Sequence, residues 1–597
     1  MNFSANWLPN FYSTFILQLS NMKQGITLAA ITIAAFLVAF TAIRPRTISN
    51  KVNTAGDVVE CGPTDRTTVL FNAERKFIPL PGWGNYSFRI ATKSDSAQYY
   101  FDQGLNLFYS FHLGESRASF LEAQRHDPAC AMAYWGYAMA SGPIINNTVY
   151  NFTDANIISS LAKAYDLTND PIEKDLIKAQ QARYVNDNSL KRRDLFIAYR
   201  DAMKVLYEKY KDNIEVATLY ADAAMMVDAR NWYDISGNPY DGTDDIIRVL
   251  EEIIAKNPNQ PAALHYYIHM VETSHTPERA RDESDRLMYL MPSVTHMVHM
   301  PSHIYIRTGD YKKGVLSNQL AVKGYDLYKQ TIKNGWEGSR HMYLYHNLDM
   351  QGSNALMMGN YAAASEAFQT NAKRFKPQDT AAYTSGGYGH YVQFLTVQPY
   401  LLKVRFGKWK EILSSKKPVS NNNAHKIYWH FGQGMAQAKT NKLAAAHASL
   451  KAIKELMKDP VLEDRFGLRS RTIDIMQVPA AILAGTIALA ENRNEDAIRS
   501  LTAAVAAEDT LHYAEPESWR MPARHFLGQA LLHAGKFEKA QKVFEEDLKD
   551  HPNNFWAVSG LKEALQQQSK PDALQNAMKK YKEVFKAADI SLKGSVY

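Results

Sequence analysis

The chain has 597 residues, of which 46% are hydrophobic and 22% are charged. Both values are ordinary for a water-soluble globular protein and exclude a disordered chain or a polytopic membrane protein. The net charge of +7 comes from 68 basic and 61 acidic residues spread along the sequence, and without a cluster of lysine and arginine it argues against nucleic-acid binding. The two cysteines, Cys61 and Cys130, exclude a disulfide framework or an all-cysteine metal site and leave either two unpaired thiols or one bridge.

An apolar segment near the N-terminus is the first predicted element. It follows a leader of residues 1–25, covers residues 26–43, and is flanked by Lys23 and by Arg44-Pro45-Arg46. This length fits either an export signal or a single membrane anchor. Phe40-Thr41-Ala42 is a poor cleavage site because a bulky residue occupies the first small position, so the segment would attach the protein to the membrane if it is not cut. Both alternatives place the soluble body outside the cytoplasm, in the periplasm or anchored in the cell membrane.

Residues 44–95 read as a linker leading into an irregular or short-strand segment, and helical periodicity begins near Ser96. From there a repeat of about 34 residues indicates stacked helix pairs of the tetratricopeptide type. The best copy, at 521–552, carries the pattern of small, large, Gly, Ala, aromatic and Pro positions at Gly528, Leu531, Gly535, Ala540, Phe544 and Pro552. Further copies run through Gly104, Leu107, Phe120, Ala123 and Pro128; Gly352, Gly359, Ala364 and Phe368; Gly434, Ala446 and Leu450; and Gly485, Ala497 and Leu501.

This repeat predicts an all-α fold, a tetratricopeptide-like helical-repeat solenoid that follows the N-terminal apolar helix. Each small residue lets one helix approach its partner, and paired helices stack into a right-handed superhelix whose concave face binds a protein or peptide. The predicted divisions are 96–260 for N-terminal helical repeats, 261–400 for histidine-rich central repeats, 401–570 for C-terminal tetratricopeptide repeats, and 571–597 for a C-terminal helix and tail.

The histidines of the central repeats are the strongest functional signal. Eight of the 18 histidines fall between residues 265 and 346. His265 and His269 are four residues apart, as are His299 and His303, so each pair shares one helix face. The two pairs are separated by 34 residues, since 299 − 265 and 303 − 269 both equal 34. Equivalent helices of neighbouring repeats lie side by side, so the four imidazoles could meet at one transition metal, either zinc, copper, nickel or iron.

Other residues join this candidate site, and other interpretations of it stay open. Glu272 continues the face of the first pair, and His346 at the start of the following repeat could close the site. A buried polar network, or a direct role in ligand binding or proton transfer, would also explain the histidines. Pro301 between His299 and His303 disfavours helix at the preceding residue, so the second pair could straddle a helix start.

Three residues farther along the chain are weaker candidates for ligand binding. These are His430, Arg524 and Glu515, the last in a Glu515-Pro516-Glu517 loop near Trp519. The alternative for this loop is a solvated connection. The sequence contains no Gly-rich phosphate loop, no Gly-x-Ser-x-Gly elbow and no His-Glu-x-x-His motif, which argues against the commonest nucleotide-dependent, serine-hydrolase and zinc-protease activities. Catalytic residues are therefore not assigned, and whether the protein is an enzyme stays open.

Several short sequence motifs occur together along residues 96–560. They are Phe101-Asp102-Gln103-Gly104-Leu105, Ala133-Tyr134-Trp135-Gly136, Leu264-His265, Ile268-His269, Val298-His299-Met300-Pro301-Ser302-His303-Ile304-Tyr305, His346-Asn347, Gly432-Gln433-Gly434-Met435-Ala436 and Glu515-Pro516. In these motifs the chain resembles a family of bacterial tetratricopeptide-repeat-like proteins that has no assigned activity. The resemblance implies the helical-repeat fold but no reaction. Two functions follow as hypotheses: an exported binding scaffold, and a metalloprotein that uses the histidines.

Overall fold

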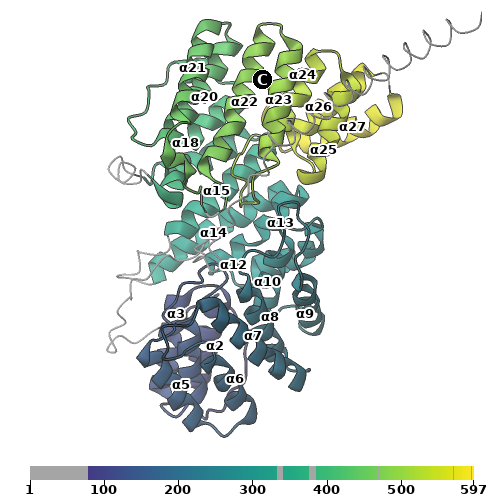
Figure 1. The fold of residues 1–597 in the computed structure, drawn as a ribbon. Helices are drawn as coiled ribbons and strands as arrows, with labels where there is room; N and C mark the ends of the chain where they lie inside the picture. Colours follow the sequence, from purple (N-terminus) through teal and green to yellow (C-terminus); the bar gives the residue numbers. More distant parts are fainter. Residues whose placement is uncertain (1–77, 332–340, 376–384, 468, 569, 593) are drawn as a thin grey trace, which may run out of the picture. The chain divides into compact units, whose positions relative to one another are not determined.

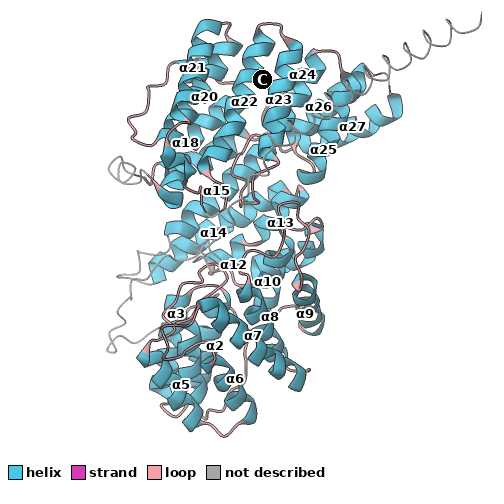
Figure 2. Cartoon of the chain, viewed as in Figure 1, coloured by secondary structure: helices cyan, strands magenta, loops and turns pink. Residues whose placement is uncertain are grey.

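A computed structural model describes residues 78–597, apart from 332–340, 376–384, 468, 569 and 593. The apolar segment 26–43, its leader and Cys61 lie outside the described residues. Cys130, which the structure does describe, is a buried free thiol. Within the described part, the chain is a succession of α-helices and short 3₁₀ turns with no β-strand, as Figure 2 shows.

The predicted all-α helical-repeat fold is therefore confirmed. The helices before the central histidines are α2 (Asp95–Tyr109), α3 (Leu113–His126), α4 (Ala131–Ala140), α5 (Ala155–Leu167), α6 (Pro171–Gln181), α7 (Arg192–Lys209), α8 (Ile214–Val227) and α9 (Thr243–Lys256). The central helices are α10 (Pro261–Val271), α11 (Arg281–Leu290), α12 (Thr295–His299), α13 (Pro301–Thr308), α14 (Tyr311–Thr331), α15 (His341–Met357) and α16 (Tyr361–Ala372). The remaining helices are α18 (Gly386–Arg405), α19 (Trp409–Leu413), α20 (Asn423–Lys439), α21 (Leu443–Leu456), α22 (Thr472–Ala490), α23 (Asn494–Glu508), α24 (Ala523–His533), α25 (Phe537–Asp550), α26 (Phe555–Gln567) and α27 (Pro571–Phe585).

Consecutive helices pack as pairs, and each pair packs on the next, as can be followed along the colour gradient of Figure 1. The glycines identified in the sequence lie at these crossings. A Cβ atom added at Gly528 of α24 would lie 2.3 Å from the ring of Phe544 in α25, and one at Gly560 of α26 would meet the same ring at 2.3 Å. One aromatic side chain thus fills notches on both neighbouring helices, which joins a pair to the helix that follows it.

The same arrangement recurs at the other end of the described chain. The ring of Phe120 in α3 lies against both Gly104 of α2 and Gly136 of α4. Gly352 of α15 likewise receives Phe368 of α16. The copy at Gly434 differs, because this glycine contacts Leu483 of α22 and Ser449 rather than the expected Leu450.

In the described part of the segment before α2, residues 78–94, the backbone is irregular and has no strand. It is not a free linker, however, because Leu80, Trp83 and Ile90 are buried in the core. Side chains of α2 hold its backbone: the amide of Leu80 donates to Gln103 Oε1 at 2.9 Å, and that of Ile90 donates to Gln98 Oε1 at 3.2 Å. The prediction of a linker rested on the Gly, Pro, Thr and Asn content of the segment, which does not indicate the apolar residues that anchor it.

Of the described helices, α22 is the one long and apolar enough to cross a membrane, and 56% of its most apolar window is buried inside the protein. It packs against α20 and α23, as expected of a core helix in a helical stack.

Replacing Gly528 with Ala tests the notch. Because the new methyl group would overlap the ring of Phe544, we expect the free energy of unfolding to fall by about 1–3 kcal/mol. Gly535→Asn is the matched control, since Gly535 has a φ of +69° that Asn tolerates and an added Cβ atom would have no neighbour within 4 Å. Thermal unfolding of the two variants beside the wild type compares them. An equal loss of stability in both would contradict the role of the notch.

Candidate metal centre

Six histidines from four helices meet in the interior of the central repeats. They are His265 and His269 of α10, His296 and His299 of α12, His303 of α13 and His346 of α15. None of the six is more than 3% exposed. So dense a set of buried imidazoles requires that nearly every ring nitrogen find a partner, because an unsatisfied buried polar atom is costly.

The first group of three consists of His265, His269 and His296. The Nε2 atom of His265 lies 3.1 Å from the Nε2 atoms of both His269 and His296. Three imidazole nitrogens bound to one tetrahedral metal ion at about 2.0–2.1 Å would lie about 3.3 Å apart. The spacing of this group is therefore close to that of a metal site.

The second group consists of His299, His303 and His346, each of which offers a ring nitrogen within 4.8 Å of the other two. The Nε2 atoms of His299 and His303 are 2.7 Å apart. The ring of His346 lies 4.5 Å from that of His299, centroid to centroid, and its buried Nε2 atom has no hydrogen-bond partner among the described residues.

Pro301 does not separate the second pair. It is the first residue of α13, and Met300 before it keeps a right-handed helical conformation with φ −49° and ψ −39°. The amide of His303 donates to the carbonyl of Met300 at 3.1 Å. The backbone thus continues in a helical path, and His299 and His303 stay on one face.

Oxygen atoms hold the outer nitrogens of His265 and His299. His265 Nδ1 donates to the carbonyl of Tyr109 at 2.8 Å. His299 Nδ1 lies 2.7 Å from Asn318 Oδ1, and Asn318 uses its amide nitrogen to donate to the carbonyl of Gly314. A hydrogen bond from Nδ1 leaves the lone pair on Nε2, which then points into the group. Metal-bound histidines in proteins are oriented in this way.

Two buried carboxylates and one arginine complete the surroundings. Glu272 Oε1 lies 3.1 Å from His269 Nδ1, and its Oε2 lies 2.6 Å from His303 Nδ1. Glu515, from the loop between α23 and α24, approaches His303 Nδ1 at 2.9 Å. Arg230 bridges the two carboxylates, at 2.8 Å to Glu272 and 2.6 Å to Glu515, and also contacts His269. The alternative of a solvated connection is therefore wrong for Glu515.

These surroundings separate the protonation behaviour of His303 from that of the other histidines. Burial lowers the pKa of His265, His269, His296, His299 and His346 well below the ordinary value. Neighbouring imidazoles add to this effect for all five, and Arg230 adds to it for His269. Burial would also lower the pKa of His303, but Glu515 and Glu272 outweigh it and raise the pKa to about 10. Without a metal, His303 is thus a cation that can donate its Nε2 proton to His299.

Backbone strain is concentrated at this cluster. Three of the five described non-glycine residues with positive φ are asparagines, which tolerate that conformation. The other two are Phe111 and Arg230, both at φ +61°. The ring of Phe111 lies against His265, His296 and His269, with centroids 4.5, 5.3 and 6.0 Å away. Two bulky residues held in an unfavourable conformation both contact the histidines, as is common at functional sites.

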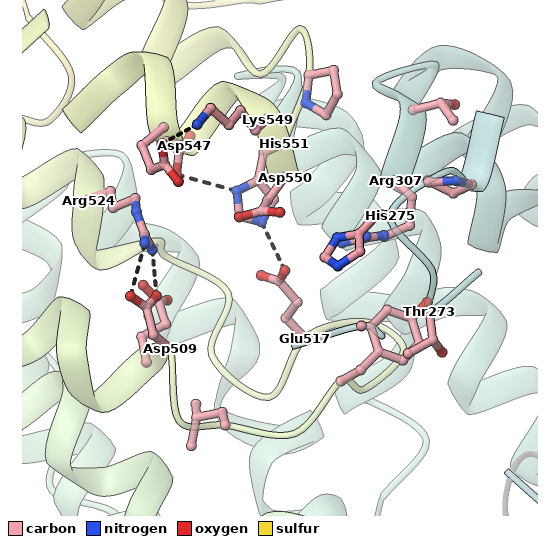
Figure 3. Close-up of a pocket in the computed structure, with 18 of the residues that line it drawn as sticks. Thr273, His275, Arg307, Asp509, Glu517, Arg524, Asp547, Lys549, Asp550 and His551 are labelled. Atoms are coloured by element: carbon pink, nitrogen blue, oxygen red, sulfur yellow. Dashed lines mark hydrogen bonds and ion pairs between the residues drawn. The ribbon is translucent and has the colours of Figure 1, made fainter. Parts of the chain in front are cut away.

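A polar pocket of about 1060 Å³ lies beside the cluster. In Figure 3, His551 joins Asp547 to Glu517, Arg524 pairs with Asp509, and His275 and Arg307 face them from the other side. Two chain segments connect this pocket to the cluster. In the first segment, Thr273 lines the pocket and directly follows Glu272 in the chain. In the second, Tyr513 and Glu517 line the pocket, and each is two residues from Glu515.

The structure brings together His265, His269, Glu272, His299, His303 and His346, all of which the sequence suggested as ligands. The structure groups these histidines differently from the prediction. Each predicted pair forms a group with a third histidine, and the four predicted histidines do not converge on one point. Glu272 lies on the outer nitrogens of His269 and His303 and not among the inward Nε2 atoms. Arg524 lines the neighbouring pocket, and His430 packs edge-on against Trp429.

Sequence reasoning missed His296, Arg230 and Phe111. The three-residue spacing of His296 and His299 could have indicated that the two neighbour each other on a helix. The 34-residue register does not include His296, which is 31 residues from His265. Arg230 and Phe111 lie in loops and carry no sequence signal of their contact with the histidines.

Comparisons with known proteins find only distant structural similarity. No family model and no curated protein matches the sequence. Similar solved structures include the human IFIT1 dimer with m7Gppp-AAAA, at a TM-score of 0.29 and 10% identity over 84% of this chain and 92% of that chain. The Cut9-Hcn1 hetero-tetramer of APC/C has a TM-score of 0.26 and 10% identity over 82% and 73%. The TPR domain of P58(IPK) has a TM-score of 0.21 and 11% identity over 83% and 99%.

The class that the fold and this site define is a tetratricopeptide-like helical-repeat protein with a buried cluster of histidines. That assignment rests on the helix pairs and their glycine crossings, since similarity at these TM-scores carries no argument.

Arg230→Met tests the charge cluster. Removing the guanidinium leaves Glu272 and Glu515 buried without their shared cation, so we expect a loss of about 3–5 kcal/mol in the free energy of unfolding. Adding Glu515→Gln should restore part of that stability, because one of the two uncompensated charges is removed. Denaturant unfolding of both single variants and the double variant measures this coupling. Additive losses would contradict it.

Glu215→Gln tests the support behind Tyr109, whose carbonyl orients His265. Glu215 accepts hydrogen bonds from Tyr86 and Tyr109, and burial raises its pKa from 4.5 to about 7. A carboxyl group with a raised pKa binds its proton more tightly in the folded state, so it lowers stability as the pH rises from 4.5 to 7, by roughly 3 kcal/mol in all.

We expect the Gln variant to lack this decline. In urea unfolding at pH 5 and pH 7.5, the free energy of unfolding of the wild type should fall relative to that of the variant as the pH rises. The exposed Glu538→Gln substitution in α25 is the control. If both variants follow the wild type across this range, Glu215 does not carry the raised pKa.

Proposed function

We propose that the protein binds transition-metal ions in two three-histidine sites buried between its repeat helices. The observation that carries this proposal is the convergence of Nε2 atoms, 3.1 Å apart in the first group and 2.7 Å apart in the second. In the first group, His265 has its Nδ1 proton committed to the carbonyl of Tyr109. Its one Nε2 lone pair faces two other imidazoles, and a single cation at the shared point satisfies all three.

The metal-free alternative places protons between the rings. In the second group His303 is protonated, and its Nε2–H donates a hydrogen bond to Nε2 of His299. A metal ion would take the place of this proton, and its binding would release it. Imidazole ligands suit zinc, copper, nickel and iron. Three protein ligands leave the fourth position of each site open, as in catalytic rather than purely structural zinc sites.

Metal content tests the proposal. The untagged protein, purified after growth with added zinc, copper, nickel and iron salts, should retain a stoichiometric transition metal by elemental analysis. His269→Ala and His303→Ala should each lower the metal content. His447→Ala should not, because that exposed histidine pairs with Glu491 away from the cluster.

Bound metal should also raise the melting temperature, since a ligand at 100–1,000 times its Kd stabilises the folded state by about 3–4 kcal/mol. Circular dichroism checks that each variant keeps its helices. A wild-type protein that retains no metal, or a His269→Ala variant with unchanged metal content, would disprove the proposal.

Binding of a protein or peptide is a second candidate function. The polar pocket of Figure 3 supports it, because cationic, acidic and imidazole side chains together line a volume of about 1060 Å³. A lining of mixed charge suits a ligand that carries both signs, as a peptide does. The location outside the cytoplasm also stays a prediction, supported by the apolar segment 26–43 of the sequence.

A further inference from the structure

We infer that the two three-histidine groups form a single coupled dinuclear centre, which takes copper and holds a small anion between its two ions. This inference rests on the proposed metal binding and adds the number of ions, their identity and the class of ligand they share.

The two groups are in direct contact. The ring centroids of His269 and His303, one from each group, are 6.3 Å apart, and those of His296 and His299 are 6.2 Å apart. α12 supplies one ligand to each group from positions three residues apart, so the spacing between the groups is set within one short helix.

Glu272 ties the groups together from the outside. One of its oxygens lies 3.1 Å from Nδ1 of His269 in the first group, and the other lies 2.6 Å from Nδ1 of His303 in the second. A change in the charge or position of either histidine therefore shifts the Glu272 carboxylate, which in turn changes the surroundings of the other histidine. Two sites that share a helix and an anchoring side chain are built as one unit.

The charge of the loaded centre calls for an added anion. Two divalent ions would bring four positive charges into the interior beside Arg230, against the two carboxylates of Glu272 and Glu515. Both carboxylates are already engaged by Arg230 and lie on the outer side of the histidines. Excess buried charge is strongly unfavourable. An anion bound at the open fourth positions would lower the excess and connect the two ions.

The ligand set favours copper. Neither carboxylate stands among the inward-facing nitrogens, and the groups contain no cysteine. For such nitrogen sites copper lies at the top of the affinity order of divalent first-row metals. The ring of Phe111 covers the first group, and all six histidines are buried. The anion must therefore be small, such as hydroxide or azide.

Copper titration of the full, metal-free protein tests this inference. We expect two Cu²⁺ per chain by elemental analysis, and a paramagnetic resonance signal well below that of two independent ions, because a bridging anion couples their spins. Added azide should shift the visible absorption of this form. His265→Ala in the first group and His346→Ala in the second should each retain one copper with the full signal of one ion.

Three results would overturn the coupled dinuclear centre: one copper per chain in the wild type, two coppers with the full signal of independent ions, or either variant losing all its copper while its circular dichroism is unchanged. His346→Asn, which changes the volume less, repeats the test if His346→Ala unfolds. The proposed function fails separately, since it requires only that the wild type bind some metal in these groups. Zinc loading without copper preference would refute the copper assignment and leave the proposed function standing.

Discussion

The carboxylate of Glu272 is the interaction on which the interior of the central repeats depends. It lies at the end of α10 and contacts Arg230, His269 and His303, which come from three separate parts of the chain. A carboxylate so deeply buried would be costly alone. Arg230 and the positive His303 offset that cost and hold the pKa of Glu272 below its ordinary value despite burial. Each of these groups therefore needs the others, and together they fix the rings whose inner nitrogens converge.

The loop of Glu515 and Glu517 links this interior to the neighbouring pocket. Glu515 points to Arg230 and His303, while Glu517 pairs with His551 on the pocket wall at 2.9 Å. Arg520 holds the loop from behind, donating to the carbonyl of Pro516 at 3.0 Å and pairing with Asp349 at 2.9 Å. The loop before the last repeats is thus part of the site, although α24 and α25 themselves have ordinary repeat packing. A ligand in the pocket would contact residues that lie one or two positions along the chain from Glu272 and Glu515, the carboxylates that orient the histidines.

The helical repeat explains why such a cluster can exist here at all. Two helices of one pair cross closely because glycine meets an aromatic ring, and the next helix adds its own glycine to the same ring. This regular packing sets equivalent positions of neighbouring repeats side by side. Side chains that recur at the repeat spacing then meet in the interior, and polar side chains that meet there must satisfy one another. The strained backbone at Phe111 and Arg230 shows that the regular packing alone does not complete the site.

The sequence by itself determined the features that depend on local periodicity. It predicted the helix pairs, the glycine crossings at Gly104, Gly352 and Gly528, and the placement of His265 with His269 on a common face. Helical geometry relates residues three or four apart, so these follow from spacing alone. Only the tertiary structure decided that each pair closes with a third histidine, that Met300 stays helical before Pro301, and that Arg230 and Glu515 meet although 285 residues separate them. Those contacts depend on how helices and loops pack across the repeats, and no periodicity in the sequence records that packing.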